Sequence, residues 1–161
     1  RIGQAIARRC HYGFDMQVSY FNRSEKELDF PATRVESLTA LAEAVDVLVI
    51  AVPGGGETRH LVDETVLRAM EPHAHLINIA RGDVVQEAAL IEALQAGRIG
   101  GAGLDVYEFE PKVPQALRDL DNVVLLPHLG TAAHEVRVDM GLMAVANLQA
   151  FIDGETAPNR V

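Results

Sequence analysis

The sequence predicts an α/β fold built on a doubly wound, mostly parallel sheet. Short apolar runs alternate with longer segments in which apolar residues recur every three or four positions, and this alternation is typical of β-α-β units. Several runs, such as VLVIAV, are apolar at nearly every position, which predicts that helices cover both faces of the sheet. The expected strands are 16–21, 46–52, 75–80, 101–106 and 123–127.

The expected helices lie between these runs and after the last of them. Gly13 and Gly97 stand where helix ends favour left-handed residues, and Gly154 follows the last periodic segment. The expected helices are 4–11, 36–44, 64–70, 87–96 and, the longest, 132–152.

Composition argues against several classes of protein. The chain has 161 residues, 48% of them hydrophobic, which is enough for one core of ordinary size. A net charge of -9 with only 14 Lys plus Arg argues against a surface for nucleic acid or anionic membrane. The single cysteine, Cys10, cannot form an intrachain disulfide, and no apolar run approaches the roughly 20 residues of a membrane span. We therefore expect a soluble, cytoplasmic protein.

The first residues resemble the end of a phosphate-binding fingerprint. Arg1, Ile2 and Gly3 precede a helical segment, as the last three residues of G-x-G-x-x-G do, and Gly3 would be the glycine that lets helix and strand pack closely. An incidental glycine is the alternative. The match predicts a Rossmann-type dinucleotide-binding domain in which Arg1, Ile2 and Gly3 contact the cofactor. It also predicts that the central first strand is missing from this sequence and that a longer protein supplies it.

The end of the second strand of such a fold contacts the cofactor's ribose. An NAD-specific site places Asp or Glu there, whereas this chain has Asn22, Arg23 and Ser24. Arg23 can pair with a 2'-phosphate and Ser24 can donate a hydroxyl, so the turn favours NADP(H) over NAD(H). A solvated turn without a ligand is the alternative.

Two further strands end in segments suited to binding small anions. Residues 53–58, PGGGET, form a glycine-rich loop after a buried strand, and a plain flexible loop is the alternative. Residues 77–83, INIARGD, place Arg81 just past the next strand, where a guanidinium could bind a substrate carboxylate. The cofactor contacts expected here are Val52, Pro53, Thr58, Ile79, Ala80 and Arg81.

The last two strands end in acids and a histidine. Asp105 lies in an apolar stretch, Glu108 and Glu110 come before Pro111, and His128 follows the final strand. An Arg, a Glu and a His at one edge of a sheet suit the reduction of a keto acid, with a cation for the carboxylate and an imidazolium for the proton. The five other histidines share no metal-like spacing, so no metal site is expected; they are His11, His60, His73, His75 and His134.

The segments HLINIARGD, ALIEALQAGRIGGAGLDVYEFEP and NVVLLPHLGT resemble, in order and spacing, the signature region of the D-isomer-specific 2-hydroxyacid dehydrogenases. This resemblance implies an oxidoreductase that moves a hydride between NADP(H) or NAD(H) and a small 2-keto or 2-hydroxy acid, such as glyoxylate or hydroxypyruvate. It implies three catalytic residues: Arg81 binds the carboxylate, His128 is the acid/base, and Glu110 orients and charges His128. The 18-residue interval from Glu110 to His128 favours Glu110 over Glu108. Expected cofactor contacts also include Asp105, at the nicotinamide carboxamide, His128 and Gly130.

The resemblance extends to domain organisation and partners. Residues 1–152 would be the dinucleotide-binding domain, and 153–161 a tail that returns to a substrate domain outside this sequence. A homodimer is expected, with a small 2-keto acid as substrate and neither nucleic acid nor membrane as partner. The turn SYFNRSEK and the PGGG loop look most like those of NADPH-preferring hydroxypyruvate and glyoxylate reductases, although many members have Pro-Leu-Thr in that loop. The alternatives are a dinucleotide-sensing, corepressor-like interaction module and an NAD-dependent, phosphoglycerate-type dehydrogenase.

Overall fold

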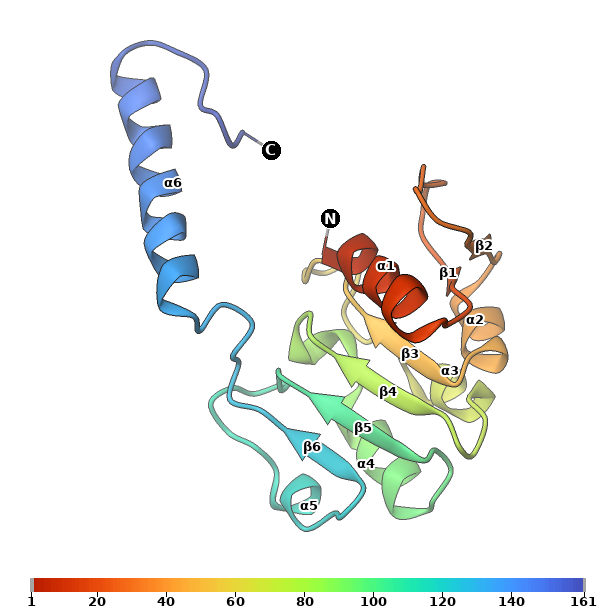
Figure 1. The fold of residues 1–161 in the computed structure, drawn as a ribbon. Coiled ribbons are helices and arrows are strands. Elements are labelled where there is room, and N and C mark those ends of the chain that lie inside the picture. The colour runs from red at the N-terminus through yellow and green to blue at the C-terminus, as the bar shows by residue number, and fades with distance from the viewer. Residues whose placement is uncertain (1, 161) are drawn as a thin grey trace. The chain divides into compact units, whose positions relative to one another are not determined.

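The computed structural model describes residues 2–160, and its centre is a four-stranded parallel sheet. The strand order is β3-β4-β5-β6, with neighbouring strands in register, as in Leu48 opposite Leu76 and Leu76 opposite Ala102. Because the strands are parallel, their carboxyl ends all lie at one edge (Figure 1). The strands are β3 (Val47–Ile50), β4 (His75–Asn78), β5 (Gly101–Leu104) and β6 (Val123–Leu125).

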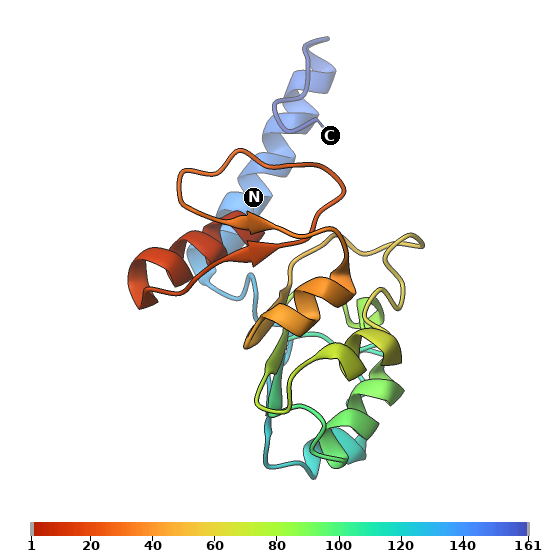
Figure 2. The same cartoon turned by 90° about the vertical axis from the view of Figure 1, so that its right-hand side faces the viewer.

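Helices lie on both sides of this sheet, but unequally. Figure 2 shows α2, α3 and α4 together on one side and α1 on the other. Alternate strand residues such as Leu48 and Leu76 are fully buried toward the core, whereas Val47 is 36% exposed. Helices therefore lie on both faces, as expected, although in residues 2–127 the second face has α1 alone (Figure 2). The helices are α1 (Ile2–Phe14), α2 (Leu38–Ala44), α3 (Glu64–Ala69), α4 (Glu87–Gln95) and the short α5 (Gln115–Arg118).

Helix ends show how local sequence sets the boundaries. Ser37 and Asp63 cap α2 and α3, because each side chain accepts a hydrogen bond from a backbone N–H in the first turn. Gly97 has a φ of +60° after α4, as expected for a left-handed helix end. Gly13 was expected to play this part for the first helix, but it lies within α1. Asp15, with a φ of +54°, follows that helix instead, and Asp is among the residues that tolerate this conformation.

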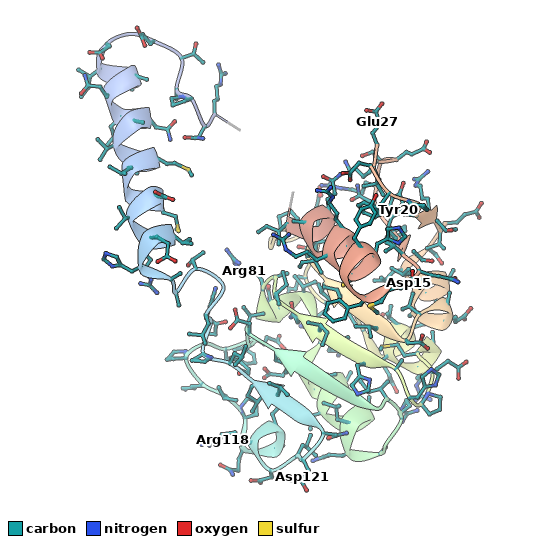
Figure 3. The ribbon with its side chains drawn as sticks, viewed as in Figure 1. Asp15, Tyr20, Glu27, Arg81, Arg118 and Asp121 are labelled. Atoms are coloured by element: carbon teal, nitrogen blue, oxygen red, sulfur yellow. The ribbon has the colours of Figure 1, made fainter. Side chains whose placement is uncertain are left out.

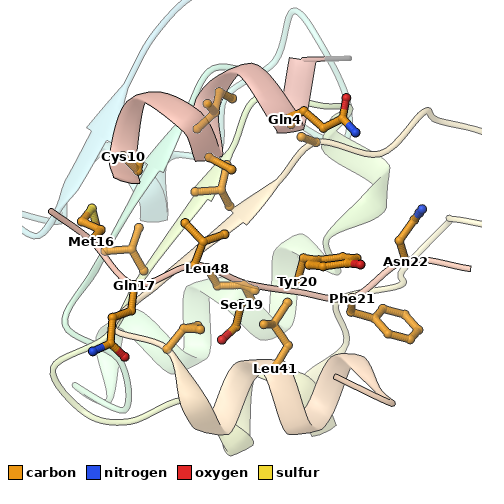
Figure 4. Close-up of a pocket in the computed structure, with 18 of the residues that line it drawn as sticks. Gln4, Cys10, Met16, Gln17, Ser19, Tyr20, Phe21, Asn22, Leu41 and Leu48 are labelled. Atoms are coloured by element: carbon orange, nitrogen blue, oxygen red, sulfur yellow. The ribbon is translucent and has the colours of Figure 1, made fainter. Parts of the chain in front are cut away.

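Two short strands form a separate sheet. β1 (Ser19–Tyr20) pairs in parallel with β2 (Thr33–Arg34), and neither is hydrogen-bonded to the main sheet. Sequence analysis did not predict β2, since two residues carry no periodic signal. A cavity of about 820 Å³ lies between β1, α1 and β3, and Figure 4 shows Cys10, Tyr20 and Leu48 around it. No strand joins β1 to β3 in residues 2–160, which confirms the prediction that this sequence lacks the first strand of a doubly wound sheet.

The chain divides into two compact units, residues 1–127 and 128–161. The second unit consists mainly of α6 (His134–Ile152), whose exposed apolar residues include Val138, Leu142 and Phe151. The predicted boundary of the nucleotide domain at residue 152 stays a prediction. No helix among residues 2–160 is both long enough and apolar enough to cross a membrane.

Candidate functional site

The candidate site lies at the carboxyl edge of the main sheet, where β3 and β4 end. A cavity of about 900 Å³ opens there, within the size range of small-molecule sites. Figure 3 places Arg81 at this edge. The structure thereby brings together six residues that were predicted from different parts of the sequence; these are Ile2, Val52, Pro53, Ile79, Ala80 and Arg81.

Asn78 fixes the backbone on which Arg81 sits. It is the last residue of β4 and only 1% exposed. Its amide Nδ2 donates to the Arg81 carbonyl at 3.0 Å, and its Oδ1 accepts from the Ala80 N–H at 3.0 Å. The Asn78 carbonyl in turn accepts from the Asp105 N–H at 3.0 Å. One buried side chain thus satisfies the backbone groups of the turn and leaves the Arg81 side chain exposed at the cavity.

Two glycines allow the neighbouring loops to approach Arg81. A Cβ on Gly82 would lie 1.8 Å from the Tyr107 carbonyl carbon, so no larger residue fits between these two backbone segments. A Cβ on Gly54 would lie 2.7 Å from the Arg81 Cγ, which places the glycine-rich loop directly against the stem of that side chain. The loops after β3, β4 and β5 therefore form one contiguous surface.

The glycine-rich loop is held in shape by its own hydrogen bonds. The Thr58 hydroxyl lies 2.8 Å from the Pro53 carbonyl and 3.2 Å from that of Gly55, and the Thr58 N–H donates to Gly55. Gly55 has a φ of +137°, which only glycine adopts readily. These contacts disagree with a plain flexible loop. They also engage the hydroxyl of Thr58, whose expected contact with the cofactor stays a prediction.

The loop after β5 carries Asp105 and Glu110. Asp105 is 7% exposed, and Glu110 Oε1 accepts a hydrogen bond from the Tyr107 N–H at 3.1 Å. The Tyr107 hydroxyl donates to the Leu126 carbonyl at 2.8 Å. Burial raises the pKa of Tyr107, and the nearby charge of Asp105 adds to the effect, so the phenol stays a neutral donor. This bond connects the loop to the segment that follows β6.

His128 begins the second unit, while Arg81 and Glu110 belong to the first. Its backbone has a φ of +55°, an uncommon conformation for a residue other than glycine, and such residues often occur at functional sites. Gly130 lies two residues further on, before α6. The grouping of His128 with Arg81 and Glu110 stays a prediction.

The expected ribose turn, Asn22–Ser24, follows β1. Asn22 Nδ2 donates to the Ser24 carbonyl at 3.0 Å, and Lys26 Nζ donates to the Ser24 hydroxyl at 2.9 Å. Arg23 Nη1 forms an ion pair at 2.8 Å with Glu57 of the glycine-rich loop, and both side chains are more than 80% exposed. Residues 22–24 thus include no acid, Lys26 contacts Ser24, and the Arg23 guanidinium is paired with Glu57.

The residues at the start of α1 suit a pyrophosphate. A Cβ on Gly3 would lie 3.4 Å from the Ala51 Cβ, so α1 passes close to the end of β3. No acidic side chain stands in the first turn of α1 as the structure describes it, so none would repel a phosphate at this positive helix end. Arg1 lies outside the described residues. With the cavity beside Ile2, these features fit a bound dinucleotide.

Comparison with known proteins agrees with this geometry. Residues 1–130 match the model for the NAD-binding domain of the D-isomer specific 2-hydroxyacid dehydrogenases. The chain belongs to this family. The 2-hydroxyacid dehydrogenase domain is 50% identical over 165 aligned positions to glyoxylate/hydroxypyruvate reductase B of Pectobacterium carotovorum, covering 100% of this chain and 51% of that protein. It is 46% identical to hydroxyphenylpyruvate reductase of Plectranthus scutellarioides, covering 96% and 49%.

Solved structures show the same relationship. The dehydrogenase domain matches the NADPH-dependent glyoxylate/hydroxypyruvate reductase of Sinorhizobium meliloti, in complex with NADP and malonate, with a TM-score of 0.90 and 46% identity over 94% of this chain and 47% of that one. It also matches the holo form of Rhodotorula graminis D-mandelate dehydrogenase, with a TM-score of 0.93 and 34% identity over 99% and 49%. The chain spans about half the length of the curated relatives it matches. The family and the Rossmann-type fold expected from the sequence are confirmed, and none of these relatives supports the corepressor-like alternative.

Sequence reasoning missed two parts of this dehydrogenase domain. The sequence could have indicated a structural role for Asn78, because an amide inside the apolar run LINIA is costly to bury without hydrogen-bond partners. His60 and Glu108 were set aside, and the structure places them 2.8 Å apart although 48 positions separate them. Among residues 2–160, no three His, Cys, Asp or Glu side chains gather as they would around a metal ion.

Proposed function

We propose that the full-length protein is an NADP(H)-dependent reductase of small 2-keto acids such as glyoxylate and hydroxypyruvate. The observation that carries this proposal is the cavity where Arg81 meets the glycine-rich loop and the start of α1. It brings a cation for a carboxylate beside residues that suit a dinucleotide. Relatives named as reductases of these acids support the choice of substrate.

The three predicted catalytic residues have different tasks. Arg81 binds the substrate carboxylate and polarises the keto group. His128 donates a proton to the keto oxygen, and Glu110 orients the ring and stabilises its charged form. The reduced nicotinamide, when bound, supplies the hydride that reduces the keto carbon. The residues that would hold the cofactor are Arg1, Ile2, Gly3, Val52, Pro53, Thr58, Ile79, Ala80, Arg81, Asp105, His128 and Gly130, with Asn22, Arg23 and Ser24 at the 2'-phosphate.

The test is the oxidation of NADPH by the purified full-length protein with glyoxylate or hydroxypyruvate. His128→Ala should lower turnover about 100- to 10,000-fold, because it removes a general acid, while the affinity for NADPH stays nearly unchanged. The matched control is His134→Ala, which removes an exposed histidine at the start of α6. Full turnover in His128→Ala would refute the acid role. If the protein bound the cofactor but turned over no small 2-keto acid, the proposal that it is a reductase of these acids would be refuted.

The choice of cofactor is tested by comparing NADPH with NADH. Arg23 in the ribose turn and Lys26, whose Nζ donates to the Ser24 hydroxyl, support NADPH, and so does the NADP complex of the Sinorhizobium meliloti reductase. Equal or better use of NADH would favour the NAD-dependent alternative instead.

We also propose a cytoplasmic homodimer in which residues 153–161 lead into a substrate domain. The coverage of only about half of each relative supports a second domain, and the exposed apolar residues of α6 support a packing partner for that helix. Light scattering on the full-length protein gives the oligomeric state, and a monomer would refute the dimer.

A further inference from the structure

A cluster of charged side chains lies behind the candidate site and outside the predicted catalytic and cofactor-binding residues. Its centre is Glu108, whose side chain is 9% exposed. Glu108 Oε1 lies 2.8 Å from His60 Nε2 and 3.6 Å from Arg59 Nη2. Glu108 Oε2 accepts from the Glu87 N–H at 3.4 Å, and the Glu108 N–H donates to Glu87 Oε2 at 3.2 Å. One carboxylate thus has partners on two other segments of the chain.

These partners belong to the loops that form the site. Arg59 and His60 directly follow the glycine-rich loop, and Glu87 begins α4 after the turn that carries Arg81. Glu108 lies between Asp105 and Glu110 in the loop after β5. The contacts of Glu108 therefore join the three loops that follow β3, β4 and β5.

The backbone beside the cluster depends on the same contacts. His60 has a φ of +50°, which is unfavourable for a residue with a side chain and persists only where its surroundings hold it. Its N–H donates to the Asp83 carbonyl at 2.7 Å, and two further bonds, between Val62 and Val84 and between Gln86 and Val62, join the same two loops. The ring of His60, held by Glu108, thus fixes the end of the glycine-rich loop against the Arg81 turn.

Packing alone does not explain a glutamate at position 108, because burying its charge costs free energy. Glu87 is 8% exposed, so two carboxylates are buried side by side. Burial raises the pKa of Glu87, and the adjacent charge of Glu108 adds to the rise. Arg59 brings positive charge to within 3.6 Å of Glu108 Oε1, and the His60 ring contacts the same oxygen. Replacing buried charges by apolar residues is often neutral or stabilising, so stability alone does not explain this pair.

We propose that Glu108 is a positioning residue, which holds the glycine-rich loop and the Arg81 turn in the arrangement that binds cofactor and substrate. It does not touch the reacting atoms. The inference rests on the proposed function, because Arg81 and the glycine-rich loop are taken there as the binding groups.

The test uses full-length Glu108→Ala, Glu108→Gln and a control, Glu92→Ala, which removes an exposed glutamate from α4. Glu108→Ala should raise the KM for the keto acid and the Kd for NADPH by roughly 10-fold, since small misplacements cost up to about 100-fold, and should change kcat less. Glu108→Gln keeps an acceptor oxygen and should recover most of the affinity. Glu92→Ala should match the parent protein.

Hydrogen exchange gives a readout that does not depend on turnover. The amides of His60, Val62 and Gln86, which bridge the two loops, should exchange faster in Glu108→Ala and at the parent rate in Glu92→Ala. Unchanged exchange and unchanged NADPH affinity would overturn the proposal, as would a fall in kcat alone. If Glu108→Ala does not fold, His60→Ala replaces it, with the same expectations. A parent protein that binds NADPH but reduces no keto acid would refute the proposed function, while exchange and NADPH affinity would still decide the role of Glu108.

Discussion

The two ends of the nucleotide-binding unit differ in how they are held together. At the carboxyl edge of β3, β4 and β5, buried side chains and close glycine contacts join three loops; Asn78 holds the turn at Ala80 and Arg81, and Glu108 contacts two other chain segments. Around β1 and β2, only a two-stranded sheet is formed, and a cavity of about 820 Å³ separates it from β3. This cavity lies where the first strand of a doubly wound sheet would pair with β1 and β3, so the carboxyl edge is supported by contacts within these residues, whereas the ribose turn would also be supported by that strand.

This difference predicts different consequences for substitutions at the two ends. Changes in the joined loops should alter stability and binding together, because each side chain there holds several segments. Changes at Arg23 in the ribose turn should alter cofactor binding without affecting the free energy of unfolding, because this side chain is 82% exposed.

The largest difference in the free energy of unfolding is expected between two Gly→Ala substitutions, one at the carboxyl edge and one in α1. Gly82→Ala places a Cβ against the Tyr107 backbone and should lower the free energy of unfolding by about 3 kcal/mol or more. Gly13→Ala, in α1, meets nothing within 4 Å and should leave that free energy unchanged or raise it by up to about 1 kcal/mol. Denaturant unfolding of the full-length variants measures both. Equal effects at the two positions would show that the carboxyl edge is no more tightly packed than α1.

The parts of the fold that could be predicted from the sequence are those that depend on local signals. The main strands could be predicted because β3 and β4 are apolar runs with a strong local signal, and family motifs added Arg81 and Glu110. The short β2 and the cluster at Glu108 could not be predicted, because they depend on contacts between distant segments; His60 and Glu108 lie 48 positions apart. The left-handed residue after α1 was misplaced at Gly13, because composition alone favours glycine over Asp15.

A smaller effect, confined to the cofactor, is expected at Arg23. Arg23→Ala should weaken binding of NADPH roughly 10- to 100-fold, since a hydrogen bond to a charged group contributes about 1.5–3 kcal/mol, and should leave NADH binding nearly unchanged. The unfolding free energy should not change, because the side chain is 82% exposed. Arg118→Ala, at an exposed position on α5, controls for the lost charge (Figure 3). Fluorescence titration with both dinucleotides measures the affinities, and an equal loss for NADH would refute a role at the 2'-phosphate.

The smallest effect is expected at Glu57, whose ion pair with Arg23 joins the two ends of the unit. A bound 2'-phosphate would compete with this carboxylate for the same guanidinium, so Glu57→Gln should strengthen NADPH binding. The gain should stay below about 5-fold, because an exposed ion pair contributes at most about 1 kcal/mol, and it should shrink as salt is added. Glu64→Gln removes another exposed carboxylate from its ion pair, with Arg68, and should leave NADPH binding unchanged. Weaker NADPH binding in Glu57→Gln at low salt would mean that Glu57 supports the bound cofactor, and that the glycine-rich loop takes part in the choice of cofactor.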